Sequence, residues 1–242
     1  MRKNRITGVC DLRFENDQIC RVWRGRAKDC DPSFYVLHRS DTTALLYRDG
    51  KLVPFCSYQG GAVYPFSKDP LKKKPFFQRS VCKEAAFVCV SKGWNHDVAW
   101  GVPNIPFKDK RTGRSYQMGL SGVFYYELGG DPLQADKIYR EFFSQGDGEA
   151  YQRKFREFIR DRIAQAVKYR FPKIFENFLE NTDFVLEPDV KFLPKQIFDI
   201  SRMLMEEIAS YEASYLYFEY GIHAAVELNR CGFIHAMICK EL

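Results

Sequence analysis

The segment from Gly101 to Pro132 constrains the fold more than any other part of the sequence. It begins with a stretch that carries Pro103 and Pro106, and we predict a rigid loop there because proline fixes φ and lacks an N–H. A polar turn at Arg111–Arg114 follows. Residues 116–128 then alternate as in a half-buried strand, which stops before an Asp-Pro pair. The segment therefore presents a rigid strand surface without an obvious nucleophile.

Further strands are predicted in the first half of the chain, where β-branched and aromatic residues gather between turn signals. Arg48-Asp49-Gly50-Lys51 predicts a tight hairpin, because glycine readily supplies the positive φ of such a turn. The strands expected besides 116–128 are Ile19–Trp23, Phe34–Leu37, Thr43–Tyr47, Leu52–Val53 and residues 85–90.

The second half changes to helical periodicity. From Glu149 to Phe171 apolar residues recur every three or four positions, and Pro172 is predicted to end this amphipathic helix. A short helix is expected at Ile174–Leu179. A second long helix is expected at about Lys195–Glu219, capped by Gly221.

This order predicts an α+β fold, with two long amphipathic helices packed beside a mainly antiparallel curved sheet and a returning C-terminal strand. Residues 1–30 are predicted to form a basic N-terminal extension, and 31–242 a single domain. Within that domain we expect a β-rich part at 31–145, an α-rich part at 146–220 and the closing strand at 222–229.

Composition limits where the protein works. The net charge of +6 permits contact with an anionic surface but is too small to require nucleic acid. No apolar run reaches the roughly 18 residues that span a bilayer, so any membrane contact is expected to be peripheral. The eight cysteines form no Cys-x-x-Cys pair, and the first residues lack a secretory apolar region. Free thiols in a reducing cytoplasm are expected.

No pattern in the sequence predicts catalysis, a cofactor or a metal. Phosphate-binding, dinucleotide and nucleophile-elbow motifs are absent. His38 and His223 fall on predicted strands as structural side chains, and His96-Asp97 reads as a loop. Cys231, His235 and Cys239 would share one face of a helix, but Gly232 and the lack of a fourth ligand argue against zinc.

A basic connector offers the one candidate binding segment. Lysines attract anionic head groups at about 1 kcal/mol each, and neighbouring rings can enter the lipid interface. The alternative is a solvated loop whose phenylalanines turn inward. The candidate contact residues are Lys68, Lys72, Lys73, Lys74, Phe76 and Phe77.

Several of these segments together resemble the stomatin/prohibitin/flotillin (SPFH, or band 7) domain, in particular soluble bacterial members without a membrane anchor. The likeness covers about residues 31–234, and Asp131-Pro132 follows the strand as in the family. Gly61 departs from the family, since a proline–glycine turn is usual there. The segments that carry the likeness are Asp49–Lys51, Gly60–Pro65, Trp100–Pro103, Ile105–Asp109, Gly122–Leu128 and Tyr220–His223.

The resemblance implies a non-enzymatic scaffold or adaptor that self-associates and organises or recruits proteins at the cytosolic face of a membrane. Typical members carry an anchor before the domain and many a coiled coil after it. Neither pattern occurs here, so weak self-association is expected. Partners would be membrane proteins or an anionic lipid surface. The alternative is a soluble nucleic-acid-binding protein that uses the basic N-terminus and the Lys68–Phe77 connector, against which the modest charge argues.

Overall fold

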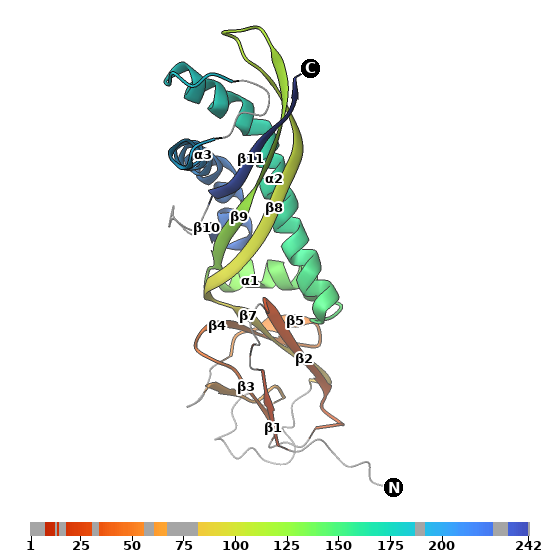
Figure 1. The fold of residues 1–242 in the computed structure, drawn as a ribbon. Coiled ribbons are helices and arrows are strands. Elements are labelled where there is room, and N and C mark those ends of the chain that lie inside the picture. Colours follow the sequence, from red (N-terminus) through yellow and green to blue (C-terminus); the bar gives the residue numbers. More distant parts are fainter. Residues whose placement is uncertain are drawn as a thin grey trace. The chain divides into compact units, whose positions relative to one another are not determined.

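A computed structural model describes residues 8–12, 14, 18–30, 34–55, 61–66, 82–186, 192–224 and 232–241, with the backbone alone for 93–95, 209–214, 224 and 232–241. Helices and mainly antiparallel sheets form an α+β fold, which confirms the predicted class (Figure 1). The chain divides into two compact units. Unit 1 comprises Met1–Gly93 with Leu128–Arg153, and unit 2 comprises Trp94–Glu127 with Lys154–Leu242. The predicted domain limits at residues 30 and 31 stay predictions.

The main sheet of unit 1 is antiparallel and has the strand order β2-β7-β4-β5. Its strands are β2 (Cys20–Arg26), β7 (Glu84–Ser91), β4 (Thr42–Arg48) and β5 (Lys51–Val53). The predicted β4–β5 hairpin is confirmed, with Asp49 at φ 49° and Gly50 at φ 77°. Both residues are left-handed, as a two-residue turn between twisted strands requires.

A smaller sheet in unit 1 joins β1 (Val9–Asp11), β3 (Tyr35–Leu37) and β6 (Ala62–Val63). Strands β1 and β3 pair in parallel, which the sequence did not predict. Both sheets of the unit contribute to one buried cluster, in which the Trp23 ring stacks on Phe34 with centroids 4.9 Å apart. Strands β1 and β2 lie in the stretch predicted to be a basic extension, and β2 pairs with β7 along its whole length.

Unit 1 also contains α1 (Pro132–Ile138) and the short π-helix η2 (Tyr139–Phe143), neither of which was predicted. The Asp-Pro pair that stops the preceding strand also begins α1. The Asp131 side chain caps this helix, accepting from the N–H of Leu133 at 2.7 Å and of Gln134 at 3.2 Å. Pro132 occupies the first helical turn, where its missing N–H costs nothing.

The sheet of unit 2 is built around β9 (Ser115–Leu128), which pairs with β8 (Gly93–Lys108) and with both C-terminal strands. The predicted alternation along β9 is confirmed, since every even-numbered position from Tyr116 to Leu128 is buried. Figure 1 shows β8 and β9 as two long, twisted neighbours. The turn between them contains Gly113 at φ 73°.

The prediction of a loop at Gly101–Asp109 and at His96-Asp97 was wrong, because both segments lie mainly in β8. Proline is tolerated in a strand at the edge of a sheet, where its missing N–H costs no ladder bond. Side chains alternate between buried and exposed along β8, except that Pro103 and Asn104 are both exposed. The alternation is resumed at Ile105, which is fully buried.

The first long helix, α2 (Glu149–Glu180), buries the predicted face of Phe155, Ile159, Ile163 and Val167. The predicted end at Pro172 was wrong, and the short helix expected at Ile174–Leu179 is the continuation of α2. An interior proline costs about 3 kcal/mol. Stacking of Phe175 on Phe171 at 5.2 Å and on Phe178 at 5.9 Å offsets this cost, because all three rings are buried.

The second long helix, α3 (Pro194–Tyr220), confirms the prediction almost to the residue. Gly221 ends it at φ 65°, and its N–H donates to the Tyr217 carbonyl at 2.8 Å. Helix α3 lies beside α2 in unit 2, where the Phe158 and Tyr220 rings meet edge-to-face at 5.3 Å. Among the described helices, none is both long enough and apolar enough to cross a membrane.

Two strands follow α3. β10 (Ile222–Ala224) covers the start of the predicted closing strand, and residues 225–230 lie outside the described part. β11 (Gly232–Glu241) was not predicted and pairs with β9 over residues 116–123. His235 and Cys239 therefore do not share a helix face as considered for zinc binding, since strand residues four apart are separated by about 13 Å.

Candidate functional site

The six predicted membrane-contact residues all lie in residues 67–81, outside the described part of the chain. Lys68, Lys72, Lys73, Lys74, Phe76 and Phe77 therefore remain candidates on sequence grounds alone. Two other features of the described residues bear on function. They are a cavity in unit 1 and the state of the sheet edges in each unit.

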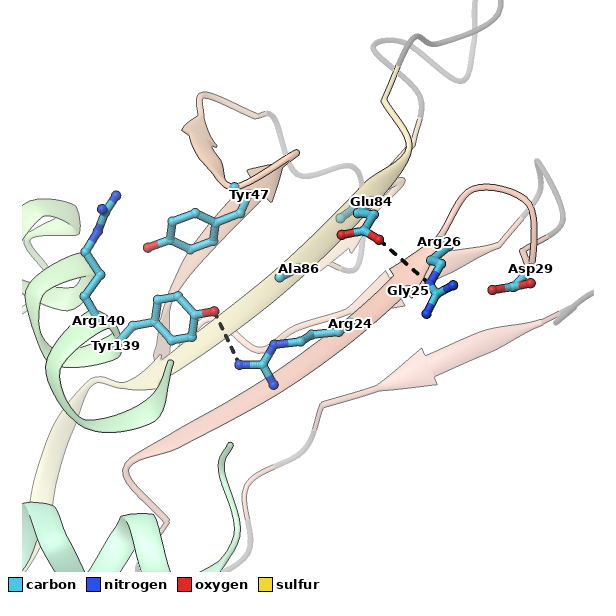
Figure 2. Close-up of a pocket in the computed structure, with 11 residues that line it drawn as sticks. Arg24, Gly25, Arg26, Asp29, Tyr47, Glu84, Ala86, Tyr139 and Arg140 are labelled. Carbon is cyan, nitrogen blue, oxygen red and sulfur yellow. Dashed lines mark hydrogen bonds and ion pairs between the residues drawn. The ribbon is translucent and has the colours of Figure 1, made fainter. Parts of the chain in front are cut away.

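The cavity of unit 1 has a volume of about 650 Å³ and lies on one face of the main sheet (Figure 2). Its base is a row of three residues at the same register, Arg24 on β2, Ala86 on β7 and Tyr47 on β4. The small Ala86 side chain between two large neighbours leaves the space open. The cavity is lined by Arg24, Gly25, Arg26, Asp29, Tyr47, Gly50, Glu84, Ala85, Ala86, Tyr139 and Arg140.

Arg24 reaches from β2 to the helical segment that covers part of the sheet. Its Nη2 donates to the Ser144 carbonyl at 2.8 Å, with longer contacts at 3.4 Å to the Phe143 carbonyl and the Tyr139 hydroxyl. A cation at these carbonyls complements the negative end of the short helix. The Nε and Nη1 of Arg24 have no hydrogen-bond partner among the described residues.

Arg26 lies two residues along the same strand and therefore on the same face of the sheet. Its Nε stands 3.8 Å from Glu84 Oε1, beyond hydrogen-bond distance. The side chains of Arg26 and Glu84 are 59% and 70% exposed, so this ion pair contributes little to stability. Within the described residues, the guanidinium of Arg26 makes no hydrogen bond.

The third arginine of the cavity is committed to its own partner. Arg140 Nε donates to both oxygens of Asp136 at 2.9 Å, and its guanidinium lies 5.9 Å from the centre of the Tyr47 ring. The Tyr47 hydroxyl also donates to Asp136. Burial, and then this hydrogen bond to a carboxylate, raise the pKa of Tyr47 far above its usual value. Tyr47 therefore stays neutral and fixed as a wall of the cavity.

One edge of the main sheet in unit 1, that of β2, is bonded to side chains at its first residues. Asp147 Oδ2 accepts from the N–H of Val22 at 2.8 Å, and Gln152 Nε2 donates to the carbonyl of Cys20 at 2.8 Å. Both backbone groups belong to β2 and point away from β7. At Cys20 and Val22 these outward groups are already bonded, which opposes pairing with another strand at this part of the edge.

The sheet of unit 2 differs at the β8 edge. Among the strands that the structure describes, β8 pairs with β9 alone, along a strand of 16 residues. Pro103 and Pro106 interrupt the far end of this edge, because neither has an N–H to offer. Residues 95–102 of β8 contain no proline.

Three histidine rings lie against aromatic rings, and the structural role expected for His38 and His223 stays a prediction. The His38 ring lies 5.7 Å from the Phe87 ring, and the His223 ring 4.6 Å from the Tyr217 ring. The His96 ring stacks on Tyr126 at 5.4 Å. In the described part of the chain, no three His, Cys, Asp or Glu side chains gather closely enough to hold a metal ion.

Neither the cavity nor the open edge was predicted from the sequence. One signal for the cavity is present, the alternation of Arg24 and Arg26 with Trp23 and Gly25. It places two cations on one face of β2 and an aromatic core residue on the other.

Comparison of the chain with protein families, with curated proteins and with solved structures found no match.

Proposed function

We propose that this protein is a non-enzymatic scaffold or adaptor that self-associates and organises or recruits proteins at the cytosolic face of a membrane. One structural observation carries the proposal. Strand β8 pairs with β9 alone among the described strands, whereas the outward groups of Val22 and Cys20 on the β2 edge of unit 1 are bonded to Asp147 and Gln152. The resemblance of residues 31–234 to the SPFH domain supports the same function.

An open strand edge is a template for another strand. The outward N–H and C=O groups of an unpaired edge generally bond to water until a second strand pairs with them. Two copies of β8 can pair antiparallel about a twofold axis, so that each supplies the groups the other lacks. The prolines limit this pairing to about residues 95–102, which favours weak, reversible association over fibre growth.

The experiment compares two variants that add the same charge. Ala99 is exposed near the middle of the free stretch of β8, and Gln165 is exposed on α2. Lysine on an edge strand opposes strand addition. In sedimentation velocity, we expect the parent and the Gln165→Lys control to show the same concentration-dependent association, and Ala99→Lys to lose it. Equal association of all three proteins would refute the assembly surface.

The membrane side of the proposal depends on the connector from Lys68 to Phe77. Four lysines beside two phenylalanines suit a peripheral contact with anionic lipid. Several weak contacts joined in an oligomer bind a surface far more tightly than one alone. Self-association through β8 would therefore strengthen the membrane contact, which links the two parts of the function.

A further inference from the structure

We propose that the cavity of unit 1 is a binding site for a phosphate monoester, held by Arg24 and Arg26. The two arginine side chains lie on the same face of β2, and both line the cavity (Figure 2). Phosphate suits them because its oxygens accept the paired N–H groups of arginine. The site is distinct from the β8 edge and does not depend on self-association.

The first argument is the number of donors left over. Among the described residues, Arg24 donates from Nη2 alone and Arg26 makes no hydrogen bond. Arg140 is fixed differently, because its Nε donates to both oxygens of Asp136. A ligand would therefore meet Arg24 and Arg26 with unused donors, beside an Arg140 whose charge is paired with Asp136.

The second argument is preorganisation. The Nη2 bond from Arg24 to the Ser144 carbonyl fixes that guanidinium before any ligand arrives. Within the described part of the chain, Arg26 is restrained only by its exposed, long ion pair with Glu84. Such a pair contributes little, so a dianion can replace Glu84 at small cost.

The third argument is size. A cavity of about 650 Å³ is far larger than one phosphate group and falls in the range of small-molecule sites. Ala86 and the nearly buried rings of Tyr47 and Tyr139 supply an apolar wall beside the arginines. The ligand should therefore be a phosphate with an organic substituent rather than inorganic phosphate.

The phosphate monoester could belong to a soluble metabolite or to a lipid head group, since both present the same dianion. Titration calorimetry with phenyl phosphate, glycerol phosphate and inorganic phosphate tests the soluble source. Flotation with vesicles of phosphatidic acid in phosphatidylcholine tests the lipid source. Vesicles of equal surface charge made with phosphatidylglycerol, a diester, are the control.

We expect phenyl phosphate to bind saturably and more tightly than inorganic phosphate. Arg24→Gln and Arg26→Gln should each weaken binding about tenfold, because each removes charged hydrogen bonds. Arg24→Lys should give an intermediate loss, since it keeps the charge and loses the fork. Arg39→Gln is the matched control, as Arg39 is exposed, pairs with Asp41 at 3.1 Å and lies outside the cavity.

Arg24 also bonds to the 143–144 backbone, so its variant could lower the melting temperature. Arg26 makes no such bond, so a loss of binding in Arg26→Gln cannot be attributed to unfolding of this segment.

Binding should strengthen from pH 5.5 to pH 7.5, because the second phosphate pKa is about 6. Phosphatidic acid flotation that soluble phenyl phosphate abolishes would assign the lipid source, and binding of the soluble ester alone the soluble source. The proposal is overturned if no probe binds, or if Arg39→Gln weakens binding as much as Arg26→Gln.

Discussion

The side-chain amide of Gln152 is hydrogen-bonded to the backbone on both sides of the Ile19–Cys20 peptide bond. Its Oε1 accepts from the Ile19 N–H at 2.8 Å, and its Nε2 donates to the Cys20 carbonyl at 2.8 Å. A third bond runs from Nε2 to the Asp147 carbonyl at 2.9 Å. One buried side chain at the start of α2 thus holds the start of β2, more than 130 residues away in sequence.

Replacement of Gln152 should therefore destabilise the protein strongly. In Gln152→Leu, the buried N–H of Ile19 and two carbonyls lose their partner, and we expect a loss of about 2–4 kcal/mol. Chemical denaturation measures this loss, with the exposed Gln165→Leu as the matched control. An equal effect of the two substitutions would mean that Gln152 does not anchor β2.

The buried face of α2 gives a second prediction. Ile163 is 1% exposed, so Ile163→Asp places a charge in the core and should cost several kcal/mol. Thermal unfolding followed by circular dichroism measures the change. Gln165→Asp, two residues away on the exposed side, should change the melting temperature little. An unchanged melting temperature in Ile163→Asp would contradict the packing of α2.

The turn after β8 predicts a dependence on acid pH. Burial would raise the pKa of Asp109, but hydrogen bonds from the Arg111 N–H and the Thr112 hydroxyl, with the Arg111 charge, lower it below the usual 3.8. A carboxyl with a lowered folded pKa stabilises the protein at pH values above its unfolded pKa. This stabilisation is lost as pH falls through the folded pKa.

Asp109→Asn removes this titration. We expect the variant to be less stable than the parent at pH 7, with the difference shrinking as pH falls below about 4. Urea unfolding at a series of pH values measures both effects. A difference that stays constant from pH 7 to pH 2 would show that the carboxylate charge plays no part.

The connector predicts a salt-dependent membrane contact. Changing Lys72, Lys73 and Lys74 to Glu should nearly abolish binding to anionic liposomes and leave the melting temperature in place. Salt should weaken binding of the parent, since screening shortens the reach of charge to about 8 Å at physiological ionic strength. Flotation assays measure both effects. Binding of the glutamate variant at the level of the parent would leave the connector as a solvated loop.

Replacing the two phenylalanines of the connector distinguishes insertion of their rings into the lipid from packing of the rings in the protein core. Changing Phe76 and Phe77 to Ser should weaken liposome binding with little effect on its salt dependence, because shallow insertion is apolar. Unfolding of this variant would instead place those rings in the core, and membrane localisation would then require a partner protein. A polynucleotide filter assay at the same salt tests the nucleic-acid alternative.

The parts of the fold that follow local periodicity were predictable from the sequence. The alternation along β9, the buried face of α2 and the Gly221 cap each depend on residues close in sequence. The wrong predictions concern segments whose conformation depends on contacts with residues distant in sequence. Pro172 stays within a helix because buried rings on both sides compensate for it, and Pro103 and Pro106 lie in a strand because β8 is at an edge.

The site features were less accessible from the sequence because they join distant segments. The cavity requires β2, β4 and β7 in register, with Tyr139 from a π-helix that no local pattern predicted. The bonds to the first residues of the β2 edge come from Asp147 and Gln152, which look like ordinary polar residues near a helix start. Strand β11 gains its stability from pairing with β9, and its own sequence resembles a helix face as much as a strand.

Hydrogen–deuterium exchange at low and high protein concentration tests the assembly surface most directly, because it reports which amides become protected. If copies pair through β8, the outward-pointing amides of residues 95–102 should exchange more slowly in the concentrated sample. The Val22 amide of β2, which already donates to Asp147, should exchange at the same rate in both samples. Oligomers seen by sedimentation without any slowing in residues 95–102 would contradict assembly through the β8 edge.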